Sequence, residues 1–291
     1  MLRNLFHKPA PALRRYVQFY TQREVRPSDP LFVQPIPARA APILEFIYGD
    51  QFKVIYPGSP VERPTPATVI VGMLTRPLGK LQLQGDFQAF VIVFQPTGLD
   101  ELFAVSLGEL TDRDYDSRLV LGKPVVELQE RLGDRDSFAS RVSVVDAYLT
   151  RRIPFELRSD AITMATRLMS MSGGRLQIPA LASMVGVGQR RLERGFASRF
   201  GVRPKLYARI VRFQAALDSK VKSATKSWTD VAYEFGYYDQ MHLIHDLEEF
   251  TAGTPTENQR VMEAFFPRKQ IHIVRAGRGA RNPRVVPRFV M

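Results

Sequence analysis

The sequence predicts an α+β protein, in which a β-rich amino-terminal half with helices is followed by an all-helical carboxy-terminal domain. Three observations predict this organisation. Thirteen of the 21 prolines fall in the first hundred residues, between short runs rich in β-branched and aromatic residues. From about residue 98, apolar residues recur at helical spacing. The helical region also contains an internal repeat. We predict domains at residues 1–152 and 158–266, and a basic tail at 267–291.

The β-rich half contains seven predicted strands. They are residues 16–20, 31–36, 43–48, 52–56, 68–74, 80–84 and 87–95. Many short strands without long intervening helices indicate a small barrel or a sandwich. The clearest hairpin signal is KLQLQ-GD-FQAFVIVFQ, because Gly85 supplies the positive φ that a two-residue turn requires.

Three helices are predicted at the end of this half, over residues 99–105, 124–132 and 137–152. In the last of them, Phe138, Val142, Val145 and Leu149 form an apolar stripe on one helical face. Such a face needs a partner, either the barrel or a second copy of the helix. The stripe is the sequence's only indication of a homodimer.

The formal net charge of +12 is unevenly distributed. Residues 1–150 carry 17 basic and 17 acidic side chains, whereas residues 151–266 carry 17 basic and 12 acidic ones. The last 25 residues add seven basic groups and no acid. This asymmetry favours a polyanionic partner for the second half. Alternatively, the charge forms a solubilising surface with a disordered tail. We expect the tail to be flexible and to bind phosphate; the alternatives are a tail that is only mobile, or one that adds an edge strand.

The internal repeat carries most of the functional information. IPALASMVGVGQRRLERGFASRFGVRP aligns with WTDVAYEFGYYDQMHLIHDLEEFTAGTP. Two helices separated by a glycine turn are predicted in each copy, and a long helix at about 204–219 joins the copies. The aligned positions are Ala182 with Ala232, Gly186 with Gly236, Leu192 with Leu243, Phe196 with Leu247, and Pro204 with Pro255.

Each repeated residue type has a structural reason. A small alanine allows two helices to approach closely, and glycine permits the left-handed turn between them. The apolar pair anchors the second helix and leaves its opposite face free for a DNA groove. Ser227 and Asp230 form a capping-box-like start for the helix at 228–235. Gly188 provides no side-chain cap, at a cost of about 1 kcal/mol or less.

Two such units in tandem resemble the DNA-binding domain of the AraC/XylS family of regulators. The motifs are the A-x-x-x-G turns, the G-V-R-P step and the closing G-T-P-x-E. The first half resembles the cupin-like sensor barrels of that family through PALRRYVQFY and VSLGELTDR. The resemblance implies a transcription regulator that binds promoter DNA and activates transcription by contacting RNA polymerase, with repression as the alternative.

The resemblance places base contacts at the exposed early positions of the second helix of each unit. The candidates are Gln189, Arg190, Glu193 and Arg194 in the first unit, and Gln240, Met241, His242 and His245 in the second. Arginine can donate to guanine O6 and N7, and glutamate can accept from cytosine N4. The predicted phosphate contacts are Arg191, Arg199, Arg203 and Lys205.

The second unit differs chemically from the first. Its recognition helix carries acids (Asp239, Asp246, Glu248 and Glu249) and no basic residue. We therefore expect the second unit to contribute less to DNA affinity and to bind DNA more through shape complementarity.

Other functions find little support. His242, His245 and Asp246 share a helix, but a metal site needs more ligands than the nearby sequence supplies. There is no cysteine, nucleophile elbow or phosphate-binding glycine loop, so we expect neither an enzyme nor a cofactor. A nonspecific nucleic-acid binder and, less favoured, an enzyme with a barrel active site remain the alternatives. No membrane span or secretion signal is present, and we expect the cytoplasm.

Aromatic residues on the predicted strands allow two interpretations. They are Phe19, Tyr20, Phe46, Tyr48, Phe52, Phe90 and Phe94. They would form either the barrel core, which sequence favours, or the wall of a pocket for a small-molecule effector.

Overall fold

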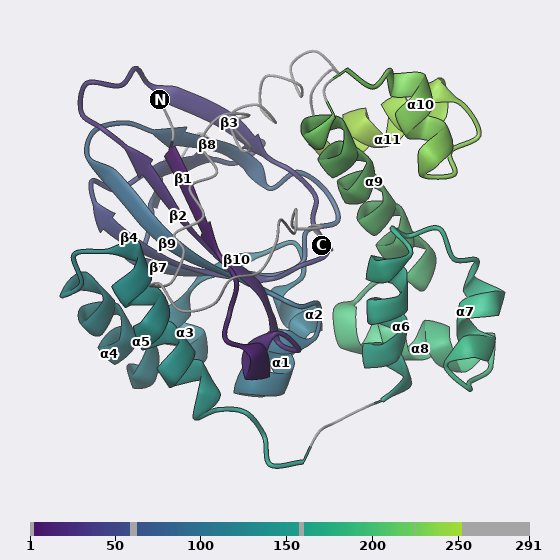
Figure 1. Ribbon diagram of the computed structural model, residues 1–291, viewed down its shortest axis with the longest axis horizontal. Helices are drawn as coiled ribbons and strands as arrows, with labels where there is room; N and C mark the ends of the chain where they lie inside the picture. Colours follow the sequence, from purple (N-terminus) through teal and green to yellow (C-terminus); the bar gives the residue numbers. More distant parts are fainter. Residues whose placement is uncertain (1–2, 59–62, 157–159, 224, 252–291) are drawn as a thin grey trace, which may run out of the picture.

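The computed structural model describes residues 3–58, 63–156, 160–223 and 225–251. Two antiparallel sheets, the 3-10 helix η1 (Pro11–Leu13) and five α-helices make up the described part of the first half, which we call the sheet unit (Figure 1). Six further helices make up the second half, the helical unit, which lies beside it.

The two sheets face each other and enclose apolar side chains. The larger sheet has the order β1-β2-β9-β4-β7-β10 and the smaller one β3-β8-β5-β6. Their strands are β1 (Arg3–His7), β2 (Val17–Val25), β3 (Phe32–Ile36), β4 (Ile43–Gly49), β5 (Lys53–Ile55), β6 (Arg63–Pro64), β7 (Thr68–Val71), β8 (Gly79–Leu83), β9 (Phe87–Phe94) and β10 (Asp114–Asp116). No strand pairing joins the two sheets in the described part of the chain. The architecture is therefore two facing sheets, and closure into a barrel is not shown.

The predicted hairpin at Gly85 is wrong. Gly85 has the expected φ of 84°, but β8 and β9 belong to different sheets. The turn instead meets the turn that follows β4, where Asp50 accepts from the backbone N–H of Asp86 at 2.7 Å. Asp86 in turn accepts from the N–H of Asp50 at 2.8 Å. The sequence correctly predicts a turn at Gly85, but β9 pairs with β2 on one side and with β4 on the other, so β8 cannot pair with it.

Helices of the sheet unit cover the outer face of the larger sheet (Figure 1). They are α1 (Gly98–Phe103), α2 (Leu107–Leu110), α3 (Ser117–Leu121), α4 (Lys123–Gly133) and α5 (Phe138–Thr150). The stripe of α5 is buried, with Val145 and Leu149 fully inaccessible. The Phe138 ring lies 5.7 Å from that of Phe90, and Asp146 accepts from the Tyr20 hydroxyl at 2.7 Å. The stripe therefore packs on its own sheet, and it no longer supports a homodimer.

A cavity substitution tests this assignment. Val145→Ala should destabilise the folded chain by about 2 kcal/mol, because two buried methyl groups are lost. The loss should be the same at low and high protein concentration in thermal melts, whereas a dimer contact would make it concentration-dependent. Ser143→Ala, on the exposed side of α5, is the matched control.

The helical unit confirms the repeat. Its helices are α6 (Ala161–Met171), α7 (Ile178–Met184), α8 (Gln189–Phe200), α9 (Pro204–Lys222), α10 (Trp228–Glu234) and α11 (Gln240–Thr251). Helices α7 and α8 form one helix-turn-helix, and α10 and α11 form the other. Gly186 and Gly236 both have a φ of 70°, the left-handed turn conformation. The predicted capping box of Ser227 and Asp230 is present, and Gly188 makes no side-chain cap.

Several predictions lie outside the described residues. These are Pro255, the closing G-T-P-x-E motif, the remainder of the predicted domain to residue 266, and the basic tail at 267–291.

Candidate nucleic-acid interface

Helix α8 presents basic side chains on the face away from its core. Leu192 and Phe196 are fully buried and anchor the helix. Arg190 and Arg194, one turn apart, are exposed on the opposite side. Gln189 is also exposed and donates to the Glu193 carboxylate at 2.8 Å. The four predicted base-contact residues of the first unit therefore lie together at the start of α8.

Three of the predicted phosphate contacts are also exposed. Arg191 flanks the face of α8, and Arg203 and Lys205 lie at the start of α9, just after the turn that ends α8. All three side chains are therefore accessible from solvent.

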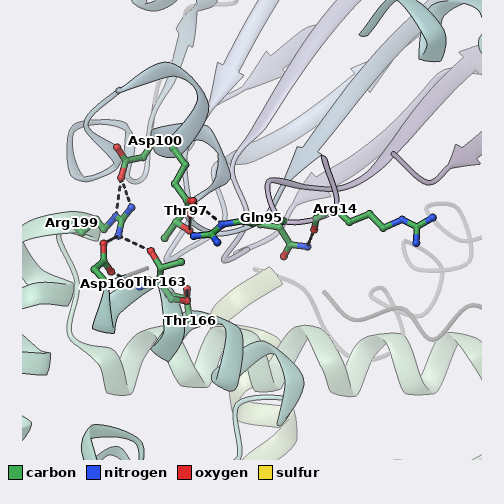
Figure 2. A network of polar contacts seen from close by, with 10 residues as sticks. Arg14, Gln95, Thr97, Asp100, Asp160, Thr163, Thr166 and Arg199 are labelled. Atoms are coloured by element: carbon green, nitrogen blue, oxygen red, sulfur yellow. Dashed lines mark hydrogen bonds and ion pairs between the residues drawn. The ribbon is translucent and has the colours of Figure 1, made fainter. Parts of the chain in front are cut away.

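Arg199 is different. Its guanidinium makes a contact at 2.6 Å with Asp100 of α1 and one at 2.7 Å with Asp160, the residue that caps α6 (Figure 2). Burial alone would raise the pKa of Asp160, but hydrogen bonds from Thr163 and the charge of Arg199 bring the pKa below its usual value. Arg199 is thus held between the two units, and this geometry argues against the phosphate contact predicted from the sequence.

Helix α11 presents a different surface at the equivalent positions. Met241 and His245 occupy the places of Arg190 and Arg194, at an offset of 51 residues, and both are exposed. His242 is exposed at the flank, with its ring 5.2 Å from Tyr237. Gln240 accepts a hydrogen bond from Thr229 at 2.7 Å.

The acidic residues of α11 are mostly engaged within the protein. Asp239 caps the helix by accepting from the N–H of His242 at 2.8 Å. Asp246 is fully buried and lies 2.6 Å from Arg209 of α9, which also pairs with Glu249 at 2.7 Å. Arg209 is therefore a structural residue that sequence reasoning did not identify. No local pattern could have revealed it, because its partners lie about 40 positions along the chain.

The Arg209 ion pair should control the stability of the helical unit. Arg209→Met should cost about 3 kcal/mol, because Asp246 would be left buried without its counter-ion. Adding Asp246→Leu should recover most of the loss, since no buried charge then remains. Urea denaturation of the single and double variants measures both effects. A double variant as unstable as the single one would show that Arg209 acts only through packing.

A second candidate site is a cavity of about 220 Å³ between the two sheets, lined also by residues of α9 and α11. Phe19 and Phe52 line it. The other predicted aromatics pack instead into the core that faces the helices: Tyr20, Tyr48, Phe46, Phe90 and Phe94. The strands thus contribute aromatic side chains to a core on the outer face of the larger sheet and to the wall of a cavity on its inner face.

Asp218 of α9 lines this cavity and is almost inaccessible. Burial raises its pKa to about 7, although Lys222 at 3.7 Å acts in the opposite direction. A carboxyl with a raised pKa in the folded state keeps a proton that the unfolded chain releases. It therefore destabilises the fold increasingly as pH rises from about 4 to about 7.

Asp218→Asn should remove this pH dependence. The variant should gain stability relative to the parent chain as pH rises from about 4 to about 7, since each unit of pKa shift corresponds to about 1.4 kcal/mol. Melting temperatures of both chains at pH 4.5 and pH 7.5 measure the difference. A constant difference across this range would contradict the raised pKa.

Two further sequence expectations concern metals and membranes. Within the described ranges, no three histidine or acidic side chains are grouped so that they could hold a metal ion. Across the same ranges, no helix has the length and apolar character that crossing a membrane requires.

Comparisons with known proteins agree with the helical geometry. Residues 181–260 match the model of a helix-turn-helix domain family, which confirms the AraC-type resemblance of this region. Residues 5–116 match a domain family of unknown function. Among curated proteins, none matches the chain in sequence.

Solved structures of three proteins or protein forms were found to be similar to this chain. Apo ToxT from Vibrio cholerae, in a variant form, has a TM-score of 0.51 at 10% identity and covers 88% of this chain and 100% of its own. ToxT with a bound unsaturated fatty acid has a TM-score of 0.48 at 10% identity, covering 91% and 95%. An AraC-type regulator from Chromobacterium violaceum has a TM-score of 0.33 at 23% identity, covering 37% and 94%. The first of these matches shows a common fold, and the helix-turn-helix match supports a DNA-binding transcription regulator.

Proposed function

We propose that this protein is a sequence-specific transcription regulator whose helices α8 and α11 enter two successive major grooves of promoter DNA. The observation that carries the proposal is the tandem arrangement of two helix-turn-helix units. In each unit, the second helix begins with exposed side chains and is anchored by buried residues on its other face.

The length of α9 fits this mode of binding. Its 19 residues extend about 28 Å at roughly 1.5 Å per residue. Figure 1 shows α7 and α8 near one end of α9, and α10 and α11 near the other. Successive major grooves on one face of DNA lie about 34 Å apart. The length of α9 is thus of the same order as the groove-to-groove separation, which supports the proposed binding mode.

The two units would use different chemistry. Arg190 and Arg194 would donate to guanine, Glu193 would accept from cytosine, and Arg191, Arg203 and Lys205 would bind phosphate. Met241 would contact a thymine methyl group, and His245 would donate to or accept from a base edge. We retain Gln189, Gln240 and His242 as peripheral base contacts, because all three are exposed at the starts of α8 and α11.

Further partners follow from the family resemblance. We propose that the sheet unit binds a small-molecule effector in the cavity, and that the protein activates transcription by contacting RNA polymerase. Homodimer formation stays a prediction without a structural argument, since the α5 stripe is buried within one chain.

Two alternatives predict different measurements. An architectural binder would lose affinity as salt rises, yet would hardly distinguish one sequence from another. An enzyme with a site between the sheets would turn over a ligand without DNA. The helix-turn-helix match favours a regulator over an enzyme.

Selection of binding sites from a random DNA pool tests the proposal directly. Arg190→Ala and Arg194→Ala should each weaken the selected site by about 1–3 kcal/mol and relax the base preference at one position.

Lys205→Ala is the matched control, because loss of a phosphate contact should weaken all sequences alike and reduce the salt dependence. If Arg190→Ala and Arg194→Ala behaved like this control, both arginines would have to be reassigned to phosphate. If no sequence were enriched by the parent chain, specific recognition would be refuted.

A further inference from the structure

The cavity between the sheets contains polar groups that the protein leaves unsatisfied. Gln34 of β3 is 1% exposed, and neither its amide nitrogen nor its amide oxygen has a hydrogen-bond partner in the described structure. The Nε and Nη2 atoms of Arg39 are buried and likewise without a partner there. Both side chains line the cavity. Buried donors and acceptors in this state are costly unless another molecule satisfies them.

Arg39 is charged and faces a largely apolar space. Burial lowers the pKa of its guanidinium to about 10, which leaves it protonated at neutral pH. Glu45 and Asp114 also line the cavity and are close enough to favour the charged form, while the positive charge of Arg23 opposes it. Asp114 accepts from the Tyr56 hydroxyl at 2.6 Å, and no ion pair joins it or Glu45 to Arg39 in the described ranges. The Nε and Nη2 donors of Arg39 thus remain available for an acceptor that enters the cavity.

Most of the remaining wall is apolar, although Thr21, Thr65 and Asp218 also line the cavity, and the volume of the cavity limits the size of a ligand. Ile43, Val69, Val71, Leu81 and Phe52 form the walls between the sheets. A cavity of about 150 Å³ admits benzene. A volume of about 220 Å³ therefore has room for a ring-sized apolar body with a small polar head.

The chain segment that carries Arg39 is also a contact with the helical unit. The backbone N–H of Ala38 donates to the carbonyl of Phe250 in α11 at 2.8 Å. The N–H of Ala40 donates to the side chain of Gln214 in α9 at 3.0 Å. Between them, Arg39 exchanges two backbone hydrogen bonds of 2.8 Å with Leu74 of the sheet unit. One extended segment therefore connects the cavity to both α9 and α11.

We propose that the cavity binds a carboxylic acid with an apolar body about the size of a phenyl ring. Its carboxylate would accept from Arg39 and from the amide of Gln34, and its body would fill the space between the sheets. Phe213 and Leu217 of α9 also line the cavity, so the bound acid contacts the helical unit directly. This proposal names the chemical class of the effector and rests on the proposed role of the sheet unit, but not on DNA binding.

Calorimetric titration of the full chain without DNA tests the site. Phenylacetate is the probe, and phenylacetamide is its uncharged match. Phenylacetate should bind about tenfold or more tightly than the amide, since hydrogen bonds to charged groups are the stronger class. Equal binding, or no binding of either compound, would overturn the proposal.

Two substitutions and a control assign the residues. Arg39→Met should abolish the preference for the acid, whereas Arg76→Met, at an exposed position of the same unit, should keep it. Gln34→Leu should weaken phenylacetate binding yet raise the melting temperature of the ligand-free chain, because an unsatisfied buried amide is removed. If Gln34 had a purely structural role, Gln34→Leu should instead lower the melting temperature. If Arg39→Met still preferred phenylacetate over phenylacetamide, the assignment of Arg39 would be refuted.

The DNA experiment separates this proposal from the proposed function. A chain that selects a DNA sequence but does not discriminate acid from amide would refute only the ligand. A chain that binds phenylacetate through Arg39 but selects no DNA sequence would refute only the regulator.

Discussion

The burial of α9 is the constraint on which the arrangement of the helical unit depends. Ile210, Phe213 and Ala216 of this helix are fully inaccessible. The ring of Tyr207 lies 5.4 Å from those of Phe196 and Phe200 in the first helix-turn-helix. Further along, the Phe213 ring lies 5.2 Å from that of Phe250 in the second. Because one helix supplies the core of both units, neither can turn about α9 without opening a cavity in it. The ion pair between Arg209 and Asp246 fixes the same junction.

The local features of this fold could be predicted from the sequence, because they arise from short-range chemistry. Glycine at 186 and 236, the capping box at Ser227, and the apolar pairs of α8 and α11 act within a few residues, and each is present in the structure. The exposed starts of α8 and α11 follow from the same periodicity. The comparison with the helix-turn-helix family covers this region.

Long-range pairing could not be predicted. The turn at Gly85 has the expected backbone, yet its strands pair elsewhere, because hydrogen-bond partners in a sheet are selected across the whole chain. The roles of Arg199 and Arg209 show the same limit. The sequence suggested a phosphate contact for Arg199 and no role for Arg209, but carboxylates distant in sequence hold both side chains inside the protein. Likewise, the lack of a hydrogen-bond partner for the Gln34 amide could not be predicted, because it depends on how the two sheets pack against each other.

The unlike side chains at the matched positions of α8 and α11 have a consequence for the geometry of the target. On the proposed mode of binding, the arginine pair of one helix and the methionine–histidine pair of the other would require different base sequences. A single chain would then recognise a site without dyad symmetry, and such a site has a direction along the duplex. The polarity of the bound molecule relative to a neighbouring gene would be set by the DNA itself, without a second subunit.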